Sequence, residues 1–390
     1  MALADQRTPI LFVFGTRPEA IKLAPVIREL SAWPEFECKI CVTGQHREML
    51  AQFLELFELQ PDWNLDVMRP DQDLAYLTGA VLSGISGVLD RWPPDRVIVQ
   101  GDTTSTFAAA LAAFYHKIPV AHVEAGLRTG DIYAPWPEEV NRRLVARIAD
   151  LHFAPTARAR DHLLREGIAG PRILVTGNTG IDALLWVSDR LEACPELGAR
   201  ASSRLGGRFA DKRVILMTGH RRENFDGGLE RIACAMARIA ARPDVGIVFP
   251  VHPNPNVQRA MEPLRGSENI LMVEPVDYPE LVYLLKRCHF VVTDSGGIQE
   301  EAPSFGKPVL VTREATERPE AMEQGLARLV GTDERLLFEA MSALLDDPEA
   351  YRRMSRVANP YGDGRASRRV AERLSIERTR ADRTAVAAPC

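Results

Sequence analysis

The sequence predicts an α/β protein built from two doubly wound parallel sheets. The chain has 390 residues, which at roughly 150 residues per domain gives two or three compact domains. Short apolar runs alternate with longer segments of helical period, and this alternation starts again after the middle of the chain. Near-continuous apolar strands joined by helices are typical of parallel sheets that helices cover on both faces.

The apolar runs mark the expected strands. In the first half they are Ile10 to Phe14, Cys38 to Thr43, Val97 to Gln100, Val120 to Val123 and Leu151 to Ala154. In the second half they are Val214 to Met217, Val245 to Val251, Ile270 to Val273, Phe290 to Thr293 and Val309 to Thr312. Helical patterns fill the gaps, so each half repeats the strand–helix–strand order from which parallel sheets are built.

The two sets of strands predict two domains, residues 1–176 and residues 177–361. The boundary is expected near Gly177, ahead of a polar stretch over residues 184–212 that has the composition of a helix and a connection. No low-complexity linker separates the halves, so we expect them to pack closely around a cleft and to bind ligands at the carboxyl ends of their strands. The tail 377–390 has no apolar period and is expected to be disordered and solvated.

Composition and charge exclude several classes of protein. Apolar residues make up 46% and charged residues 26%, which excludes disordered, collagen-like and coiled-coil chains. The 48 Lys and Arg residues against 53 Asp and Glu residues give a net charge of -5, so there is no global basic field to hold a nucleic acid or an anionic membrane. The sequence shows no apolar run of membrane-spanning length and no signal-peptide pattern.

The cysteines favour a reducing cytoplasm. There are 6 of them, and they are scattered along the chain rather than spaced as in a secreted disulfide scaffold. Cys38 and Cys41 form a CxxC, but they lie inside an apolar run and no second pair follows. A buried strand therefore explains them better than a zinc or redox site.

Polar motifs follow the strands of the first half. Gly15 permits a tight turn, and Arg17 and Lys22 then stand where a helix N-terminus would face an anion; an ordinary turn with surface cations explains the segment equally well. Asp102 and Glu124 follow two consecutive strands. Carboxylates at adjacent strand ends suit acid/base chemistry, because repulsion and burial raise the pKa of one more than that of the other. A helix cap at Asp102, or a solvated pair of loops, is the alternative.

Three further positions carry chemistry-bearing side chains. Glu138 follows a stiff Pro-Trp-Pro segment and stands in the first turn of an expected helix, where the local pattern favours a structural carboxylate that complements the helix dipole. His220 comes directly after a strand and beside Arg221, which favours acid/base chemistry or a phosphate contact over a structural role. His252 follows the next strand in a turn rich in Pro and Asn, and a turn role has equal weight there.

The segment after Thr293 is the most informative one. Ser295, Gly296 and Gly297 lead from a strand into a helix, so that consecutive amides and the positive helix end converge on one spot that suits a diphosphate. Glu301 stands about one turn into that helix, where a carboxylate accepts hydrogen bonds from ribose hydroxyls in dinucleotide folds. Arg318 follows the next strand and adds a cation to the same rim.

Together these segments resemble a known family. In chain order, FGTRPEAIKLAPV, TGQHREML, GDTTST, HVEAGLRTGD, PWPEEVNRRL, TGHRREN, DSGGIQEEAPS, GKPVLV and TERPEA look like motifs of the non-hydrolysing UDP-N-acetylglucosamine 2-epimerases, from about Ile10 to Asp363. The resemblance implies a GT-B fold of two Rossmann-like domains with the active site in the interdomain cleft. It also implies that the second domain binds UDP and that a C-terminal helix over about residues 362–376 joins the first. The implied activity is conversion of UDP-GlcNAc into UDP-ManNAc for bacterial surface polysaccharides, without NAD, metal or another cofactor, in a homodimer.

The resemblance also implies roles for individual residues. The family eliminates UDP to leave 2-acetamidoglucal, and adds UDP back after a proton has returned to the opposite face of C2. By resemblance, Asp102, Glu124 and Glu138 form the acid/base set, and His220 stabilises the departing diphosphate or assists proton transfer. The groups that would hold UDP are Arg17, Lys22, Val276 (through its backbone), Ser295, Gly296, Gly297, Glu301 and Arg318. Gln45, Arg221 and His252 stand in motifs linked to a second UDP-GlcNAc, which activates some members.

Three alternatives share parts of this pattern. The motifs around UDP do not separate UDP-GlcNAc from a related sugar such as UDP-2,3-diacetamido-glucuronate. A GT-B glycosyltransferase shares the nucleotide-binding half, but has less need for acids at both Asp102 and Glu124. A non-catalytic UDP-sugar sensor predicts the loss of at least one chemical group, yet the whole acid/base set is present.

Overall fold

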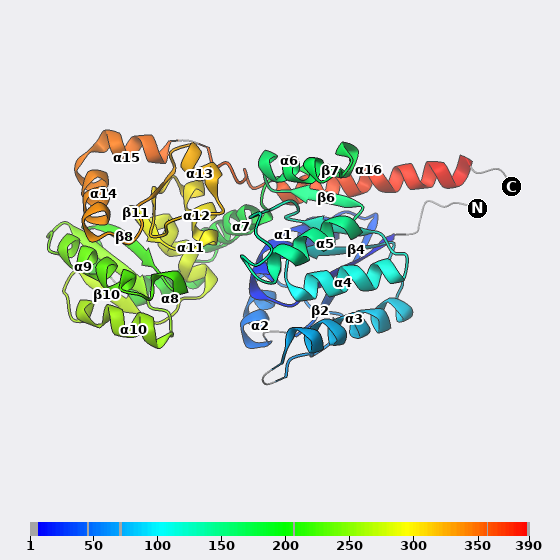
Figure 1. Cartoon of the computed structure of the whole chain (residues 1–390), viewed down its shortest axis with the longest axis horizontal. Coiled ribbons are helices and arrows are strands. Elements are labelled where there is room, and N and C mark those ends of the chain that lie inside the picture. The colour runs from blue at the N-terminus through cyan, green and yellow to red at the C-terminus, as the bar shows by residue number, and fades with distance from the viewer. Residues whose placement is uncertain (1–6, 45–46, 70–71, 206, 357, 388–390) are drawn as a thin grey trace. The chain divides into compact units, whose positions relative to one another are not determined.

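The computed structural model of the chain describes residues 7–44, 47–69, 72–205, 207–356 and 358–387. It divides into two compact units, Met1–Ala183 with Gly362–Cys390, and Leu184–Tyr361. The division falls within helix α7 (Thr179–Ala193), somewhat beyond the boundary expected near Gly177. In each unit, helices flank a parallel sheet (Figure 1). The predicted fold class, a two-domain α/β protein with two doubly wound sheets, is confirmed.

The sheet of the first unit has 7 parallel strands in the order β3-β2-β1-β4-β5-β6-β7. The strands are β1 (Thr8–Phe14), β2 (Phe36–Val42), β3 (Trp63–Asn64), β4 (Arg96–Gln100), β5 (Val120–Val123), β6 (Leu151–Ala154) and β7 (Ile173–Val175). In β1, Phe12 pairs with Ile40 of β2 on one side and with Ile98 of β4 on the other. The strand order therefore reverses between β1 and β4, and open α/β sheets bind ligands beyond the carboxyl ends of strands at such a point.

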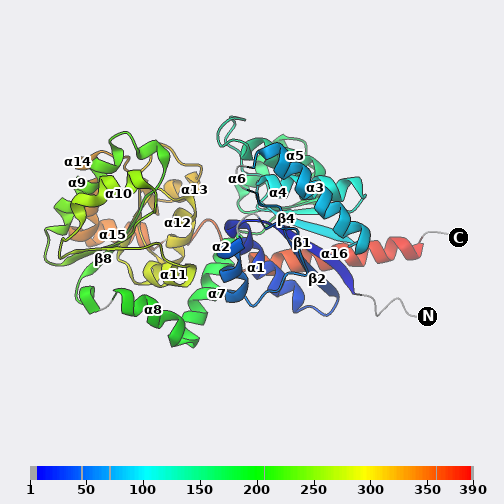
Figure 2. The ribbon, with the colours of Figure 1, turned by 90° about the horizontal axis from the view of Figure 1, so that it is seen from below.

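Helices cover both faces of this sheet (Figure 2). They are α1 (Arg17–Ser31), α2 (Arg47–Leu56), α3 (Leu74–Arg91), α4 (Thr104–Tyr115), α5 (Glu138–Ile148), α6 (Ala157–Arg165) and α16 (Ala366–Ala387). Leu11, Val13 and Val99 belong to the apolar core that the sheet shares with α3, α4 and α5, while α16 packs along α1. Burial on both faces explains why the strands read as unbroken apolar runs.

The last helix is longer than expected. Helix α16 continues to Ala387, so the expectation of a disordered tail from residue 377 is corrected over residues 377–387, and residues 388–390 lie outside the described part of the chain. The segment lacks an apolar period, which is the reason for the expectation. Helix-favouring residues and i,i+4 ion pairs, such as Arg373 with Glu377, stabilise a helix without such a period.

The sheet of the second unit has 6 parallel strands in the order β10-β9-β8-β11-β12-β13. The strands are β8 (Arg213–Thr218), β9 (Val245–Pro250), β10 (Ile270–Val273), β11 (Phe290–Thr293), β12 (Val309–Val311) and β13 (Ala327–Leu329). The helices are α8 (Pro195–Leu205), α9 (Gly228–Ala240), α10 (Pro255–Met261), α11 (Tyr278–Arg287), α12 (Gly296–Glu301), α13 (Pro319–Glu323), α14 (Glu334–Asp346) and α15 (Pro348–Ser355). Here the strand order reverses between β8 and β11.

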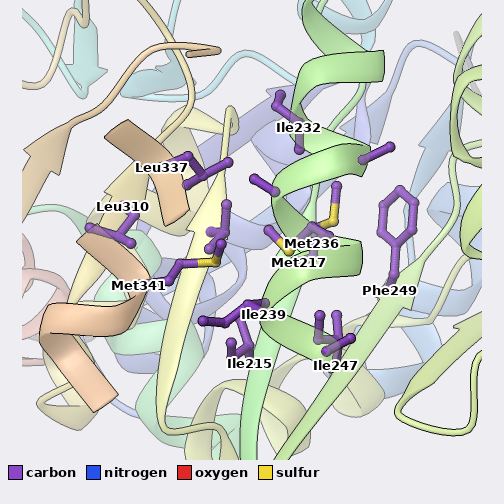
Figure 3. Packing of buried hydrophobic residues seen from close by; sticks show 14 of the residues in the cluster. Ile215, Met217, Ile232, Met236, Ile239, Ile247, Phe249, Leu310, Leu337 and Met341 are labelled. Carbon is purple, nitrogen blue, oxygen red and sulfur yellow. The ribbon is translucent and has the colours of Figure 1, made fainter. Parts of the chain in front are cut away.

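One face of the second sheet carries a continuous apolar core. Ile232 and Met236 of α9 lie over Met217 and Phe249 of the sheet, and Met341 of α14 closes the other side of the cluster (Figure 3). All these residues are buried. The core fixes β8 and β11 side by side, and thereby fixes the turns that follow them.

Two further observations concern expectations from composition. Cys38 and Cys41 lie in β2, where burial raises the pKa of their thiols to about 11 and about 12, so both stay protonated at neutral pH. Within the described residues, no helix is both long enough and apolar enough to cross a membrane.

Candidate active site

The turns after β1 and β4 lie next to each other at the reversal point of the first sheet. Gly15 follows β1, and a Cβ atom at this position would lie 2.0 Å from the Thr43 hydroxyl oxygen, so only glycine fits. Helix α1 then begins at Arg17. On the other side of the reversal point, Asp102 follows β4, and Thr103 caps helix α4 by accepting from the N–H of Thr106 at 3.1 Å.

Glu19 connects these two turns. Its carboxylate is buried, with 1% of the residue exposed. Oε2 accepts from the backbone N–H groups of Gly15 (3.0 Å) and Thr16 (2.7 Å), and from the Thr16 hydroxyl (2.7 Å). Oε1 lies 2.8 Å from the hydroxyl oxygens of Thr103 and Thr106 across the reversal point. One buried side chain therefore holds the turns after β1 and β4, which adjoin predicted site residues.

Asp102 is held from helix α5. The guanidinium group of Arg142 donates to its Oδ2, and the side chain of Asn141 donates to its backbone oxygen at 3.0 Å. Burial raises the pKa of the Asp102 carboxyl, the Arg142 cation opposes that rise, and the negative charge of Glu124 adds to it. The protonation state of Asp102 thus depends on its burial, on the cations Arg142 and Lys22, and on the neighbouring Glu124 carboxylate.

Glu124 has a strained backbone directly after β5. Its φ angle of 64° lies in the left-handed region that residues with a Cβ atom rarely adopt. The side chain is 8% exposed, forms an ion pair with Lys22 of α1 and accepts from the side-chain amide of Gln100 of β4. Elements on both sides of the reversal point therefore hold this carboxylate, and strain of this kind collects at functional sites.

The first unit thus brings Asp102, Glu124 and Lys22 together; the strand-end pattern predicted this proximity for the two carboxylates and not for Lys22. Arg17, at the start of α1, lies with its guanidinium carbon 4.9 Å from the centre of the Phe53 ring of α2. This contact fixes the direction of the Arg17 side chain by a cation–π interaction.

Glu138 and its neighbour Glu139 have different surroundings. Glu138 is the first residue of α5 and is half-buried. The side chain of Glu139 is fully buried and pairs with Arg142 (3.4 Å) and Arg143 (2.9 Å). Burial alone would raise the pKa of Glu139, but a backbone N–H and the two arginines outweigh it and lower that pKa. Through Arg142, this carboxylate is connected to Asp102.

A buried histidine contacts the backbone of the turn that carries Asp102. Nε2 of His122, in β5, lies 2.7 Å from the carbonyl oxygen of Gly101. Burial lowers the pKa of His122 to about 4, so at neutral pH the ring is uncharged and donates its Nε2 proton to that carbonyl.

In the second unit, Asp294 connects the turns after β8 and β11. It follows β11 directly and is fully buried. Its Oδ2 accepts from the backbone N–H groups of His220 and Arg221, both at 2.8 Å, and both of these residues follow β8. Burial lowers the pKa of His220, whereas the charge of Asp294 raises it. Each reversal point therefore contains a buried carboxylate that holds two strand-end turns.

The glycine-containing turn follows Asp294. The N–H of Ser295 donates to the hydroxyl of Thr293 at 3.0 Å, and Gly296 begins the short helix α12, with Gly297 exposed. A Cβ atom on Gly296 would lie 3.2 Å from Oε1 of Glu317, so any side chain here would press on that carboxylate. The predicted turn is present, and Gly297 is exposed, so a ligand can reach its backbone N–H.

Glu301 ends α12 next to the start of α11. The buried hydroxyl of Tyr278 donates to Oε1 of Glu301 at 3.2 Å. Val276 lies in the connection between β10 and α11 and is half-buried, two residues before Tyr278. The residues predicted for the nucleoside side of the ligand therefore belong to two adjoining segments.

Arg318 is held by two carboxylates. Its Nε donates to Glu300 at 2.6 Å, and its Nη1 lies 3.2 Å from Glu317. Burial alone would raise the pKa of Glu317, but Arg318 and Arg313 outweigh it and lower that pKa to about 2. Glu300 and Glu317 therefore fix the Arg318 guanidinium at the rim of the second sheet.

Of the residues linked by resemblance to a second nucleotide sugar, Gln45 lies outside the described residues. Arg221 directly follows His220, and the ring of His252 stacks on that of His220, with centres 5.2 Å apart and an interplanar angle of 18°. Arg221 and His252 thus adjoin the predicted site histidine.

Sequence reasoning assigned no role to Glu19, Arg142 or Asp294. Glu19 looks like an ordinary acid in the first turn of a helix, and Arg142 looks like one of several surface cations on α5. Only the sheet order places them beside residues from distant segments. For Asp294, the available signal is its position directly after a buried strand, the same position that singled out Asp102 and Glu124.

The site and fold together define a class of protein. Two Rossmann-like units, one with paired carboxylates and the other with a glycine-containing turn, a histidine and an arginine, are typical of enzymes that act on nucleotide-linked substrates. The sequence model of the UDP-N-acetylglucosamine 2-epimerase family matches residues 28–375. The chain belongs to this family, as its motifs predicted.

Relatives in this family match almost the whole chain. The UDP-N-acetylglucosamine 2-epimerase of Yersinia pestis is 54% identical over 94% of this chain and 98% of its own length. That of Escherichia coli K12 is 51% identical over 95% and 99%. The crystal structure of UDP-GlcNAc 2-epimerase from Neisseria meningitidis, bound to UDP-GlcNAc, has a TM-score of 0.87 and 46% identity, and covers 94% of this chain and 99% of that chain. The Methanocaldococcus jannaschii enzyme in complex with UDP-GlcNAc and UDP has a TM-score of 0.79 and 36% identity, with 95% and 100% covered.

Proposed function

We propose that this protein interconverts UDP-GlcNAc and UDP-ManNAc as a non-hydrolysing 2-epimerase. The observation that carries the proposal is the pair of carboxylates, Asp102 and Glu124, held next to Lys22 in a chain that belongs to this family over nearly its whole length. The family's solved members include one bound to UDP-GlcNAc. The product is an activated amino sugar, and we propose that it supplies bacterial surface polysaccharide synthesis.

The reaction proceeds by elimination and re-addition. The hydrogen on C2 of the sugar is not next to a carbonyl group, so direct proton removal is unfavourable. Breaking the C1–O bond to UDP together with the C2–H bond gives 2-acetamidoglucal and UDP, and leaves the proton on an enzyme base. A proton then returns to C2 from the opposite face, and UDP oxygen attacks C1. This sequence needs one base, one acid and a held leaving group.

The groups of the first unit supply the proton transfers. Glu124 pairs with the Lys22 cation, which favours its charged form, while Asp102 has a raised pKa that favours its protonated form. Carboxyls whose environments separate their pKa values suit opposite proton-transfer roles. Glu138 completes the set in this proposal, from the N-terminus of α5, where the helix dipole favours its negative charge.

The groups of the second unit retain UDP. The Ser295–Gly297 backbone and Arg318 contact the diphosphate, His220 stabilises its charge as it departs, and Glu301 accepts from the ribose. Preorganised donors of this kind stabilise developing charge without rearrangement. Arg17 and Lys22 in the first unit contribute cations, and Val276 contacts the base through its backbone.

Substrate profiling tests the activity. The purified protein is incubated separately with UDP-GlcNAc and with UDP-2,3-diacetamido-glucuronate, and the products are separated by anion-exchange chromatography. We expect UDP-ManNAc from the first substrate at least 100-fold faster than epimer from the second. Faster turnover of the second substrate would replace the proposal by epimerisation of that sugar, and release of free UDP with ManNAc would indicate hydrolysis.

Two variants test the assignment of roles. Glu124→Gln keeps the shape of the side chain and removes its charge, so we expect turnover to fall at least 100-fold while UDP affinity changes less than threefold. Arg318→Ala should weaken UDP binding at least tenfold. Near-full turnover in the first variant, or unchanged UDP affinity in the second, would contradict the assignment.

We also propose a homodimer and activation by UDP-GlcNAc. Phe114 and Tyr115 at the end of α4 are 58% and 63% exposed, and Leu144 on the adjoining α5 is 42% exposed, which suits a partner's apolar surface. Arg221 and His252 adjoin His220, so a ligand on them would touch a site group. Sedimentation equilibrium tests the dimer, and a sigmoidal dependence of rate on UDP-GlcNAc tests the activation. The free thiols of the described cysteines suit the proposed cytoplasmic location.

A further inference from the structure

We propose that Asp294 is a positioning residue that fixes the orientation and the tautomer of His220. The inference rests on the proposed function, in which His220 faces the departing diphosphate. It goes beyond that function, because it assigns a role to a buried carboxylate that touches no reacting atom.

The first observation is how Asp294 holds the backbone. Its Oδ2 accepts from the N–H groups of His220 and Arg221, both at 2.8 Å, and lies 3.4 Å from the side-chain nitrogen of Asn224. All three donors follow β8, whereas Asp294 follows β11. A single oxygen atom therefore sets the position of the His220 main chain relative to the glycine-containing turn that starts one residue after Asp294.

The second observation concerns the other oxygen of the same carboxylate. Oδ1 is buried and accepts no hydrogen bond within the described structure. It lies 3.7 Å from Nδ1 of His220. A small rotation of the imidazole brings Nδ1–H into hydrogen-bonding range, and the buried carboxylate oxygen offers that proton its strongest acceptor.

This geometry selects one form of the imidazole. With Nδ1 protonated and facing Asp294, the neutral ring presents Nε2 as an acceptor, and the charged ring presents Nε2–H as a donor toward an anion. The groups that face His220 are Asp294, the stacked ring of His252 and the Arg221 side chain. Of these, only Asp294 favours the charged form, so it stabilises the imidazolium when that ring takes up a proton opposite a leaving diphosphate.

Asp294→Asn tests the proposal with little change in shape. The amide oxygen still accepts from the N–H groups of His220 and Arg221. An NH₂ group replaces Oδ1, however, so Nδ1 of His220 faces a donor instead of an acceptor. The matched control is Asp226→Asn, an exposed aspartate in the same connection after β8. The readouts are the ¹⁵N chemical shifts of the His220 imidazole across a pH titration, kcat, and UDP affinity.

We expect neutral His220 to be the Nδ1–H tautomer in the unaltered protein and the Nε2–H tautomer in Asp294→Asn, with a lower pKa. We expect kcat to fall 10- to 100-fold, with UDP affinity changed less than threefold, and Asp226→Asn to leave all three readouts unchanged. A double variant with His220→Gln should be no slower than His220→Gln alone, because Asp294 acts through that ring.

The result that overturns the proposal is an identical tautomer and titration of His220 with and without the Asp294 carboxylate. If Asp294→Asn does not fold, the tautomer of neutral His220 in the unaltered protein tests the proposal. An Nε2–H tautomer there would contradict it. The tautomer is measured without substrate, so failure of the proposed epimerase activity is seen separately, as absence of UDP-ManNAc in the unaltered protein.

Discussion

Replacement of Glu19 by alanine is the sharpest test of how the first unit is held together. The change removes the acceptor for two backbone N–H groups, those of Gly15 and Thr16, and for three hydroxyl groups. The hydroxyls can rotate toward other acceptors; that of Thr106, for example, already lies 2.7 Å from the carbonyl oxygen of Gln100. The two N–H groups cannot.

The expected magnitude follows from those two donors. Leaving a buried donor without an acceptor costs roughly 1–3 kcal/mol, so two of them lower the free energy of unfolding by about 2–6 kcal/mol. At about 2–4 °C per kcal/mol for a unit of this size, the melting temperature of the first unit should fall by roughly 10 °C. Glu19→Gln keeps an acceptor for the N–H groups and should cost about 1–2 kcal/mol.

Calorimetry and initial-rate kinetics measure the two consequences. Glu19→Gln should slow kcat about tenfold or more, because an amide NH₂ replaces one acceptor oxygen and loosens the turn after β4 from the turn after β1, while UDP affinity stays within threefold. Glu55→Ala, an exposed glutamate on α2, is the control and should change neither property. If Glu19→Ala unfolds within 2 °C of the unaltered protein, or Glu19→Gln retains full kcat, the reasoning about this carboxylate is wrong.

Three further predictions follow from individual contacts. Burial lowers the pKa of His122 from 6.5 to about 4, so between these values the unfolded chain binds the extra proton. The His122 contribution to the free energy of unfolding should be complete above pH 6.5 and fall by roughly 3 kcal/mol as pH drops to 4. His152, whose pKa burial lowers to about 3, adds a similar loss, so in urea titrations His122→Gln should reduce the pH slope by roughly half. Arg142→Gln removes a cation that opposes the raised pKa of Asp102, so the kinetic limb set by Asp102 should move to higher pH in a pH–rate profile, and an unmoved limb would refute the pairing. Gly126 has a φ of 94°, and a Cβ atom there would lie 2.2 Å from the carbonyl oxygen of Ala159, so Gly126→Ala should cost about 3 kcal/mol or more in denaturant unfolding. Gly130 has a similar φ of 91° but nothing within 4 Å, so Gly130→Ala should cost only the backbone strain, about 1–2 kcal/mol.

Much of the fold could be predicted from the sequence, because buried parallel strands appear as short, continuous apolar runs. Runs such as Val97 to Gln100 and Phe290 to Thr293 are apolar on both faces, and the structure confirms them as β4 and β11. The short strands β7 (Ile173–Val175) and β13 (Ala327–Leu329) were not predicted, because a run of three residues is too short to show a strand pattern. The continuation of α16 beyond residue 376 could not be predicted in this way, because that segment has no apolar period.

The candidate site could be predicted only in part. Asp102, Glu124 and His220 stand at strand ends, and strand ends can be located from the apolar runs. The residues that hold them come from elsewhere in the chain, as Arg142 of α5 does for Asp102. Such partners depend on the order of strands and on the direction of each helix, and neither is encoded in local pattern. The left-handed backbone of Glu124 is equally invisible, since the sequence there offers no glycine.

The central claim is that C2 of the sugar loses its proton to an enzyme base and later receives a proton that has exchanged with solvent. Proton NMR of UDP-GlcNAc incubated with the purified protein in deuterated water, without added NAD or metal, tests it most directly. The account predicts UDP-ManNAc that carries deuterium at C2, with UDP-GlcNAc acquiring deuterium at the same position as the reaction reverses. UDP-ManNAc that keeps its C2 proton, or no UDP-ManNAc at all, would contradict the account.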